Sequence, residues 1–246
     1  MKTSFTLVFL TAAALSHAQS FRPPAVPLIA HDPYFSIWSM ADRLTDQPTK
    51  HWTGTEQPLT SLVRIDGHTY RIMGRDPRNV DPLPQTGLDV LPTRTIYRFE
   101  GAGVHVDLTF LTPALPKDLD VLSRPVTYVV WNARSTEARP HEVEVYFDAS
   151  PMLAVNTPEQ RVEWSRLRVG DMNAMRLGSQ QQPVLEKEGD NLRIDWGYLY
   201  VAAPGGTPAS EAAASLPALR SAFGSTGAIP EADDTDTNRP ANSRGV

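Results

Sequence analysis

Short segments that alternate apolar and polar side chains recur along most of this chain, and they constrain its fold more than any other feature. Residues 104–110 (VHVDLTF) and 142–147 (EVEVYF) both alternate in this way, which is typical of half-buried antiparallel strands. Turn residues separate such segments, and no clear helical period precedes Pro208. The sequence therefore predicts a mainly β fold, built as an antiparallel β-sandwich.

Individual segments give more specific expectations for the sandwich. In 142–147 the two valines and Phe147 share one face, opposite Tyr146. The segment 124–133 (RPVTYVVWNA) is apolar on both faces, which favours a central strand. The segment 192–202 (LRIDWGYLYVA) is predicted to be a strand with a bulge at its glycine, Gly197.

Proline and glycine divide the chain before and after these strands. Four prolines make residues 19–33 an extended arm, and five proline or glycine residues make 76–92 a loop. Between these two segments, Asp66-Gly67 separates two apolar runs and predicts a tight hairpin. Near the C-terminus, 210–223 is predicted to form a short helix with Ser210 as its N-cap, although Pro217 would break or kink it.

These boundaries predict three parts of the chain. Residues 1–18 read as a signal peptide, with Lys2 before a short apolar run and cleavage between Ala18 and Gln19. The apolar run is too short to span a bilayer, so a periplasmic or secreted protein is expected. Residues 19–85 form an N-terminal strap and hairpin segment, and residues 86–246 form the β-sandwich domain.

Composition excludes several classes of function. The chain carries 23 basic and 28 acidic residues, a formal charge of −5, and no long run of one sign. We therefore expect neither nucleic acid nor a membrane surface as a partner. Because the sequence has no cysteine, disulfides, thiolate metal sites and cysteine nucleophiles are excluded.

Familiar catalytic and metal-binding motifs are missing as well, and we predict no catalytic residue, metal site or cofactor in this chain. The acidic stretch 233–238 (DDTDTN) fails as a calcium loop, because Arg239 stands where glycine is required. Asp148 is the most suggestive single carboxylate. Its alternative role is an ordinary turn-capping aspartate, and the sequence favours that role.

The stretch His31–Gly54 (HDPYFSIWSMADRLTDQPTKHWTG) combines polar and aromatic residues without a helical period and with little alternation. Trp38 and Trp52 lie in this irregular strap and are free to meet a partner, whereas Trp131 and Trp196 lie in strand patterns and are expected in the core. The strap is either a surface that meets a ligand or another domain, or a cover over the β-core.

The strap, the following LVRIDGHTYRIMG and the later segments VEVYFDASPMLAVN and IDWGYLYVA closely resemble the N-terminal region of the glutaminase A family. The resemblance covers roughly residues 22–235. It implies a secreted, multidomain hydrolase of glutamine, in which a supersandwich-like β-region precedes an α/α barrel similar to those of several glycosidases. The positions that match the family's opening motif are His31, Asp32, Asp42, Asp46, His51 and Trp52.

The sequence also departs from that family, because it stops where the barrel is expected, and its tail (TDTNRPANSRGV) differs from the family pattern. The β-sandwich is accordingly expected to be incomplete at its C-terminal end. The resemblance implies a separate or missing barrel as partner, with glutamine or a glycoside as substrate of the whole protein. The expected role is a non-catalytic domain that exposes an apolar patch toward the barrel.

Two alternatives remain open. One is a binding module for carbohydrate or peptide, or part of a glycosidase-like enzyme, and the other is a domain that only scaffolds or dimerises. If the chain supports a barrel or binds a ligand, the strap residues, with Trp38 among them, lie at the interface with the barrel or at a binding surface. Under a simpler reading, their polar groups only satisfy nearby backbone.

Overall fold

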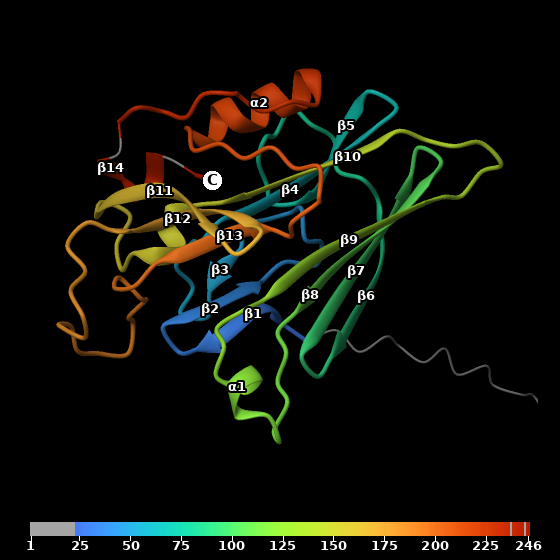
Figure 1. Cartoon of the computed structure of the whole chain (residues 1–246). Helices are drawn as coiled ribbons and strands as arrows, with labels where there is room; N and C mark the ends of the chain where they lie inside the picture. The colour runs from blue at the N-terminus through green and yellow to red at the C-terminus, as the bar shows by residue number, and fades with distance from the viewer. Residues whose placement is uncertain (1–22, 237, 244) are drawn as a thin grey trace, which may run out of the picture.

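The computed structural model describes residues 23–236, 238–243 and 245–246, so the predicted signal peptide lies outside the described residues. Strands dominate the described chain, as predicted, with two α-helices and two short 3-10 helices between them (Figure 1). The strands are β1 (Val26–Asp32), β2 (Phe35–Ser39), β3 (Lys50–His51), β4 (Leu59–Ile65), β5 (His68–Met73), β6 (Gln85–Leu91), β7 (Arg94–Gly101), β8 (Val104–Leu111), β9 (Tyr128–Ser135), β10 (Val143–Ala149), β11 (Arg161–Val169), β12 (Met172–Ser179), β13 (Leu199–Ala203) and β14 (Arg239–Pro240). The helices are α1 (Leu119–Leu122), η1 (Pro151–Ala154), α2 (Leu216–Thr226) and η2 (Ala241–Ser243).

The strands form antiparallel sheets, with the orders β1-β2-β3, β10-β4-β5, β13-β12-β11-β14 and β6-β7-β8-β9. The main hydrophobic core contains residues from the first, second and fourth of these sheets, among them Ile37, Leu59, Phe99 and Phe110. The sheet β10-β4-β5 combines strands from both sides of the predicted boundary at residue 85, and the boundary itself stays a prediction. In Figure 1, α2 lies across β4, β5 and β10, while α1 lies at the opposite end of the molecule, near β1.

The Asp66-Gly67 hairpin is confirmed, because β4 and β5 pair directly through these two residues. Both have positive φ angles, 47° and 86°, as a type I′ turn requires. Asp66 tolerates this conformation, and its carboxylate accepts hydrogen bonds from the Glu142 backbone N–H at 3.0 Å and from Arg139 at 3.1 Å. The turn residues therefore fix the register of β4 and β5 and tie the hairpin to the segment before β10.

Three expectations about the placement of strands need correction. The segment 124–133 contributes β9, which is an edge strand next to β8 and not a central one. Its outward side chains, Tyr128 and Val130, are 54% and 47% exposed. The segment 76–92 is not a loop throughout, because β6 begins at Gln85 and pairs with β7. Likewise, the expected extended arm contains β1. Proline restricts the backbone, but it does not exclude an edge strand such as β1.

The C-terminal half of β10 is covered on both faces, which the alternation of its sequence did not predict. Phe147 packs toward the main core as expected, but Tyr146, on the other face, is only 6% exposed and lies against α2. Val145, expected on the buried face, is 40% exposed. Leu219 and Phe223 of α2 form a second small core with Tyr146. The alternation in β10 predicted the face that packs on the main core and missed the face that α2 covers.

Two C-terminal expectations also need correction. Residues 192–198 are irregular, so only the second half of the predicted strand forms β13, and Gly197 marks a left-handed turn (φ 69°) instead of a bulge. α2 begins at Leu216 with Ser215 as its N-cap residue, not Ser210. Pro217 stands in the first turn, where its missing N–H costs nothing, and it therefore does not break the helix.

Candidate functional site

The structure brings four of the seven candidate strap residues together around Pro33. His31, Asp32 and Trp52 line a shallow depression of about 360 Å³, together with Ala30, Pro33 and Ser36. His51 lies beside Trp52, with 5.8 Å between the two ring centres. We call this surface, made by residues 30–36 and 51–52, the strap depression.

Hydrogen bonds to the backbone hold the strap depression in shape. The Pro33 carbonyl accepts from the Trp52 indole N–H at 2.7 Å and lies 3.1 Å from His51 Nε2. Asp32 Oδ1 accepts from the backbone N–H groups of Tyr34 and Phe35 at 2.7 and 3.0 Å. These contacts support the simpler reading for Asp32 and His51, because their polar atoms stabilise the turn between β1 and β2. The Trp52 ring itself stays 49% exposed.

The other three candidate residues are not part of this depression. Trp38 donates its indole N–H to Ser36 Oγ at 2.8 Å on β2. Asp46 accepts from the backbone N–H of Arg43 at 3.3 Å, and the Asp42 carbonyl lies 3.5 Å from Gln85 Nε2. They shape the loop between β2 and β3, so the strap is not one continuous site.

Arg193 joins the strap to the C-terminal half of the chain, and sequence reasoning missed it. Its side chain is buried, and its Nη1 donates to Thr53 Oγ1 of the strap at 3.4 Å, to Thr55 Oγ1 at 2.9 Å and to Asn191 Oδ1 at 2.7 Å. Its Nε donates to the Asn156 carbonyl at 2.8 Å. All these acceptors are neutral. An arginine in a strand-like pattern carries no sequence signal for such a role.

Aromatic contacts add to this junction. Tyr34 of the strap lies edge-on to Trp196 at 5.3 Å, and the Tyr34 carbonyl accepts from the Ile194 N–H at 2.9 Å. Trp196, expected in the core of a strand, is thus half-buried at this junction. Trp131 packs against the main core as predicted, and its indole N–H donates to Ser61 Oγ at 3.0 Å.

The two strap histidines make stability depend on pH. Burial lowers the pKa of His31, and burial together with the Arg193 charge lowers the pKa of His51. Their neutral forms are therefore favoured in the folded chain, while the unfolded chain binds protons from about pH 6.5 downward. We expect the free energy of unfolding to be highest above pH 6.5 and to fall as the pH drops below it.

Urea unfolding at pH 7.5, 6.5 and 5.5 tests this expectation. His51→Gln keeps an N–H donor for the Pro33 carbonyl but cannot be protonated, so its loss of stability at pH 5.5 should be smaller than that of the wild type. Identical pH profiles for the two proteins would contradict the role given to His51.

A segment that carries several exposed apolar side chains adjoins the strap depression. His31 Nε2 lies 3.3 Å from the hydroxyl of Thr127, just before β9. The Thr127 hydroxyl in turn lies 2.6 Å from the hydroxyl of Thr112, just after β8. The segment between these threonines contains α1, whose Leu119 is 73% exposed. We call the exposed apolar residues of this segment and of β9 the α1 surface: Leu115, Leu119, Leu122, Val126, Tyr128 and Val130.

Asp148 does not cap a turn in this structure, but belongs to a buried ion pair. It is fully buried in β10, and its two oxygens accept from Arg220 Nε and Nη2 of α2 at 2.7 and 2.9 Å. The Tyr146 hydroxyl donates to it at 2.9 Å. Burial raises the pKa of Asp148, and the paired Arg220 opposes that rise. The two parallel contacts are the geometry of an ionised carboxylate with arginine.

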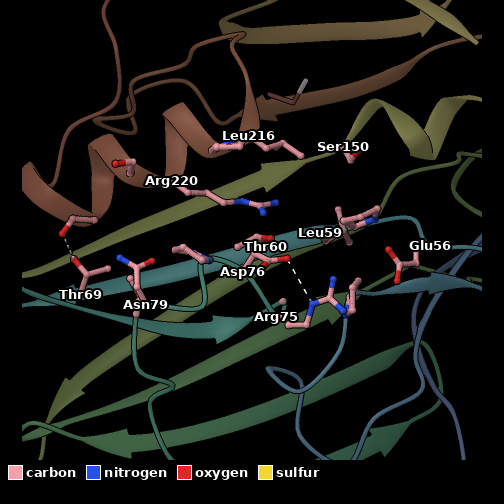
Figure 2. Close-up of a pocket in the computed structure, with 18 of the residues that line it drawn as sticks. Glu56, Leu59, Thr60, Thr69, Arg75, Asp76, Asn79, Ser150, Leu216 and Arg220 are labelled. Atoms are coloured by element: carbon pink, nitrogen blue, oxygen red, sulfur yellow. Dashed lines mark hydrogen bonds and ion pairs between the residues drawn. The ribbon is translucent and has the colours of Figure 1, made fainter. Parts of the chain in front are cut away.

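Arg220 also lines a cavity of about 840 Å³ between α2 and the turn after β5, which we call the α2 cavity (Figure 2). Thr60 of β4 and Ser150 line it as well, and Arg75 and Asp76 of the turn form the wall opposite the helix. None of the seven candidate strap residues lies here. Sequence reasoning missed this site because its walls come from segments about 150 residues apart.

Among the described residues, no group of three or more histidine, cysteine, aspartate or glutamate side chains could hold a metal ion. In the acidic stretch rejected as a calcium loop, Asp236 pairs with Arg239 at 2.6 Å. Within the same part of the chain, no helix has the length and apolar character needed to cross a membrane.

Comparison with known proteins gives two family matches. The model described as "Domain of unknown function (DUF5127)" matches residues 93–246, and "Domain of unknown function (DUF4964)" matches residues 7–85. The first match includes the C-terminal tail, which the sequence resemblance had set apart. In the structure this tail is paired, since Val246 exchanges two backbone hydrogen bonds with Ala149 at 2.7 and 3.2 Å.

Two curated relatives cover almost the whole chain. Glutaminase A of Aspergillus oryzae is 27% identical over 231 residues, which are 91% of this chain and 33% of that protein. A probable glutaminase of Arthroderma benhamiae is 24% identical over 250 residues, which are 92% of this chain and 28% of that protein. The chain thus spans about a third of the length of these relatives and resembles proteins named as glutaminases.

Proposed function

The chain belongs to the family of the domain of unknown function DUF5127, and from this membership we propose that it is the β-rich N-terminal part of a secreted glutaminase-like hydrolase. In this role it carries no catalytic group and supports a catalytic α/α barrel, which hydrolyses glutamine to glutamate and ammonia. The names of the two fungal relatives support the activity. The chain matches only about a third of the length of these relatives, which supports a division of roles between this part and the rest.

The α1 surface is the observation that carries this proposal. Leu119 and Leu122 of α1 are 73% and 45% exposed, and Tyr128 and Val130 of β9 continue the apolar residues along the chain. Single exposed apolar residues are common, but a run of them on one segment marks an interaction surface. Beside it, the strap depression supplies polar groups and the Trp52 ring. An apolar surface with a polar rim is the usual anatomy of a protein interface.

Ammonia release from glutamine tests the division of roles. We expect none from the purified chain alone. We expect activity when the chain is added to the part of Aspergillus oryzae glutaminase A that lies outside the match, produced as a separate polypeptide. Glutamine hydrolysis by the chain alone would contradict the proposal. Saturable binding of an oligosaccharide at Trp52, without any effect on the barrel, would favour a carbohydrate-binding module instead.

A double variant, Leu119→Asp with Leu122→Asp, tests the α1 surface. Both side chains are exposed, so the melting temperature should stay close to that of the wild type, whereas stimulation of the barrel should fall about tenfold because charge is placed in an apolar contact. Val184→Asp with Leu185→Asp is the matched control, since these side chains are 61% and 63% exposed in a different loop. Equal loss in both double variants would remove the α1 surface from the interface.

A further inference from the structure

The α2 cavity has the dimensions of a small-molecule site. Its volume of about 840 Å³ falls within the range of roughly 300–1,000 Å³ that such sites occupy. Side chains from β4, the turn after β5, the segment before η1 and α2 line it (Figure 2). The Asp148–Arg220 ion pair joins α2 to β10, and β10 pairs with β4, so two walls of the cavity are tied to each other without a ligand.

Arg220 has guanidinium donors in this cavity that do not bond to Asp148, and the Asp76 carboxylate on the facing turn lies close enough to contribute, after Asp148, to its raised pKa. Its Nε and Nη2 donate to Asp148, and no hydrogen bond joins Nη1 to another described residue. Figure 2 shows the side chain reaching from α2 toward Thr60. The five N–H donors of arginine lie in one plane, so the end of the group formed by Nη1 and Nη2 still has donors for a second carboxylate.

Arg75 adds a second cation on the wall opposite α2. It makes no hydrogen bond to another described residue and contacts Asp76 as an ion pair at 3.6 Å, beyond hydrogen-bond length. Its Nε is buried without a hydrogen-bond partner. A buried donor without an acceptor is unfavourable, and a bound anionic group would relieve this.

Negative groups line the same space. Asp76 faces Arg75, and Glu56 and Asp81 are also among the lining residues. The described lining includes no aromatic ring on which a sugar or a nucleobase could stack. Both signs of charge within one small cavity match a ligand that carries both signs itself.

We propose that the α2 cavity binds a zwitterionic α-amino acid, with its carboxylate on the guanidinium donors of Arg220 and Arg75 that face away from Asp148 and Asp76, and its ammonium group near Asp76 and Glu56. This site goes beyond the proposed function and rests only on the charges and walls of the cavity. It therefore holds whether or not the chain supports a barrel, and its test measures binding and not glutamine hydrolysis.

Isothermal titration calorimetry with the purified chain tests the proposal. L-glutamine and L-glutamate are the probes, and succinate, n-butylamine and glucose are comparison compounds that lack the ammonium group, the carboxylate or both. We expect saturable binding of the amino acids and at least about tenfold weaker binding of the others, since each charged contact adds that much affinity. Equal binding of succinate or of n-butylamine would overturn the zwitterion assignment, and amino acids that fail to bind at millimolar concentrations would overturn the site.

Two pairs of variants separate binding from folding. Arg75→Gln should weaken amino-acid binding about tenfold, while Arg78→Gln should leave it unchanged, because Arg78 pairs with the same Asp76 from outside the cavity lining. Ser221→Trp should fill the cavity and abolish binding, while Ala218→Trp, at another exposed position of α2, should have no effect. An unchanged affinity in both Arg75→Gln and Ser221→Trp would place the amino acid elsewhere.

Discussion

Asp148→Ala is expected to lower the free energy of unfolding by about 3–5 kcal/mol, because it leaves the Arg220 guanidinium buried without a counter-charge. Asp148 is 0% exposed and Arg220 is 8% exposed, so the guanidinium loses its carboxylate partner in a largely buried position. The Tyr146 hydroxyl loses its acceptor in the same step. Burial is the largest cause that raises the pKa of Tyr146, and it remains in this variant, so the hydroxyl stays protonated and supplies no phenolate to Arg220.

Urea unfolding of three variants measures this effect. Asp148→Ala and Arg220→Met should each be strongly destabilised, whereas the double variant Asp148→Leu with Arg220→Met should recover much of the loss, since a buried ion pair can often be replaced by apolar side chains. A loss below about 1 kcal/mol in Asp148→Ala would show that α2 is held by Leu219 and Phe223 alone.

The second large effect is expected for Arg193→Met, which should cost about 2–4 kcal/mol. The methionine fills a similar volume but leaves the Asn156 carbonyl, Thr55 Oγ1 and Asn191 Oδ1 without their shared donor. Since Arg193 joins the strap to the C-terminal half, amide hydrogen exchange should accelerate in residues 51–55 more than in β4.

An NMR titration of His51 gives an independent readout of Arg193. The nearby guanidinium charge contributes to the lowered pKa of His51, so Arg193→Met should raise that pKa, while Arg193→Lys should raise it less. Arg168→Met is the matched control, because Arg168 is exposed and its Nε donates to Gly170 within the same turn. A pKa of His51 that does not respond to Arg193→Met would contradict the proximity argument.

Local sequence patterns predicted the elements whose partners are close in the chain. The β4–β5 hairpin follows from Asp66-Gly67, because two adjacent residues that accept positive φ suffice to reverse the chain. β8 follows from strict alternation, and its inward residues Val106 and Leu108 are fully buried. For the strap, the same reasoning found four residues that do gather around Pro33, and it grouped with them Asp42 and Asp46, which lie elsewhere.

Elements with distant partners escaped the sequence analysis. The apolar residues of 124–133 suggested a central strand, yet β9 lies at an edge, because exposure depends on whether another layer covers the strand and not on its own composition. Tyr146 was assigned to an outer face for the same reason. Its covering helix lies about 70 residues later in the chain.

The sequence by itself determined the β class of this protein, the hairpin turn and its resemblance to glutaminases, since period, turn chemistry and motif are properties of neighbouring residues. Only the tertiary structure decided that Asp148 pairs with Arg220, 72 residues away, and that Arg193 reaches Thr55, 138 residues away. Burial of a charge is favourable only when a partner arrives from elsewhere in the fold, and no local pattern records that partner. The α2 cavity likewise depends on the tertiary structure, because its walls meet only after folding.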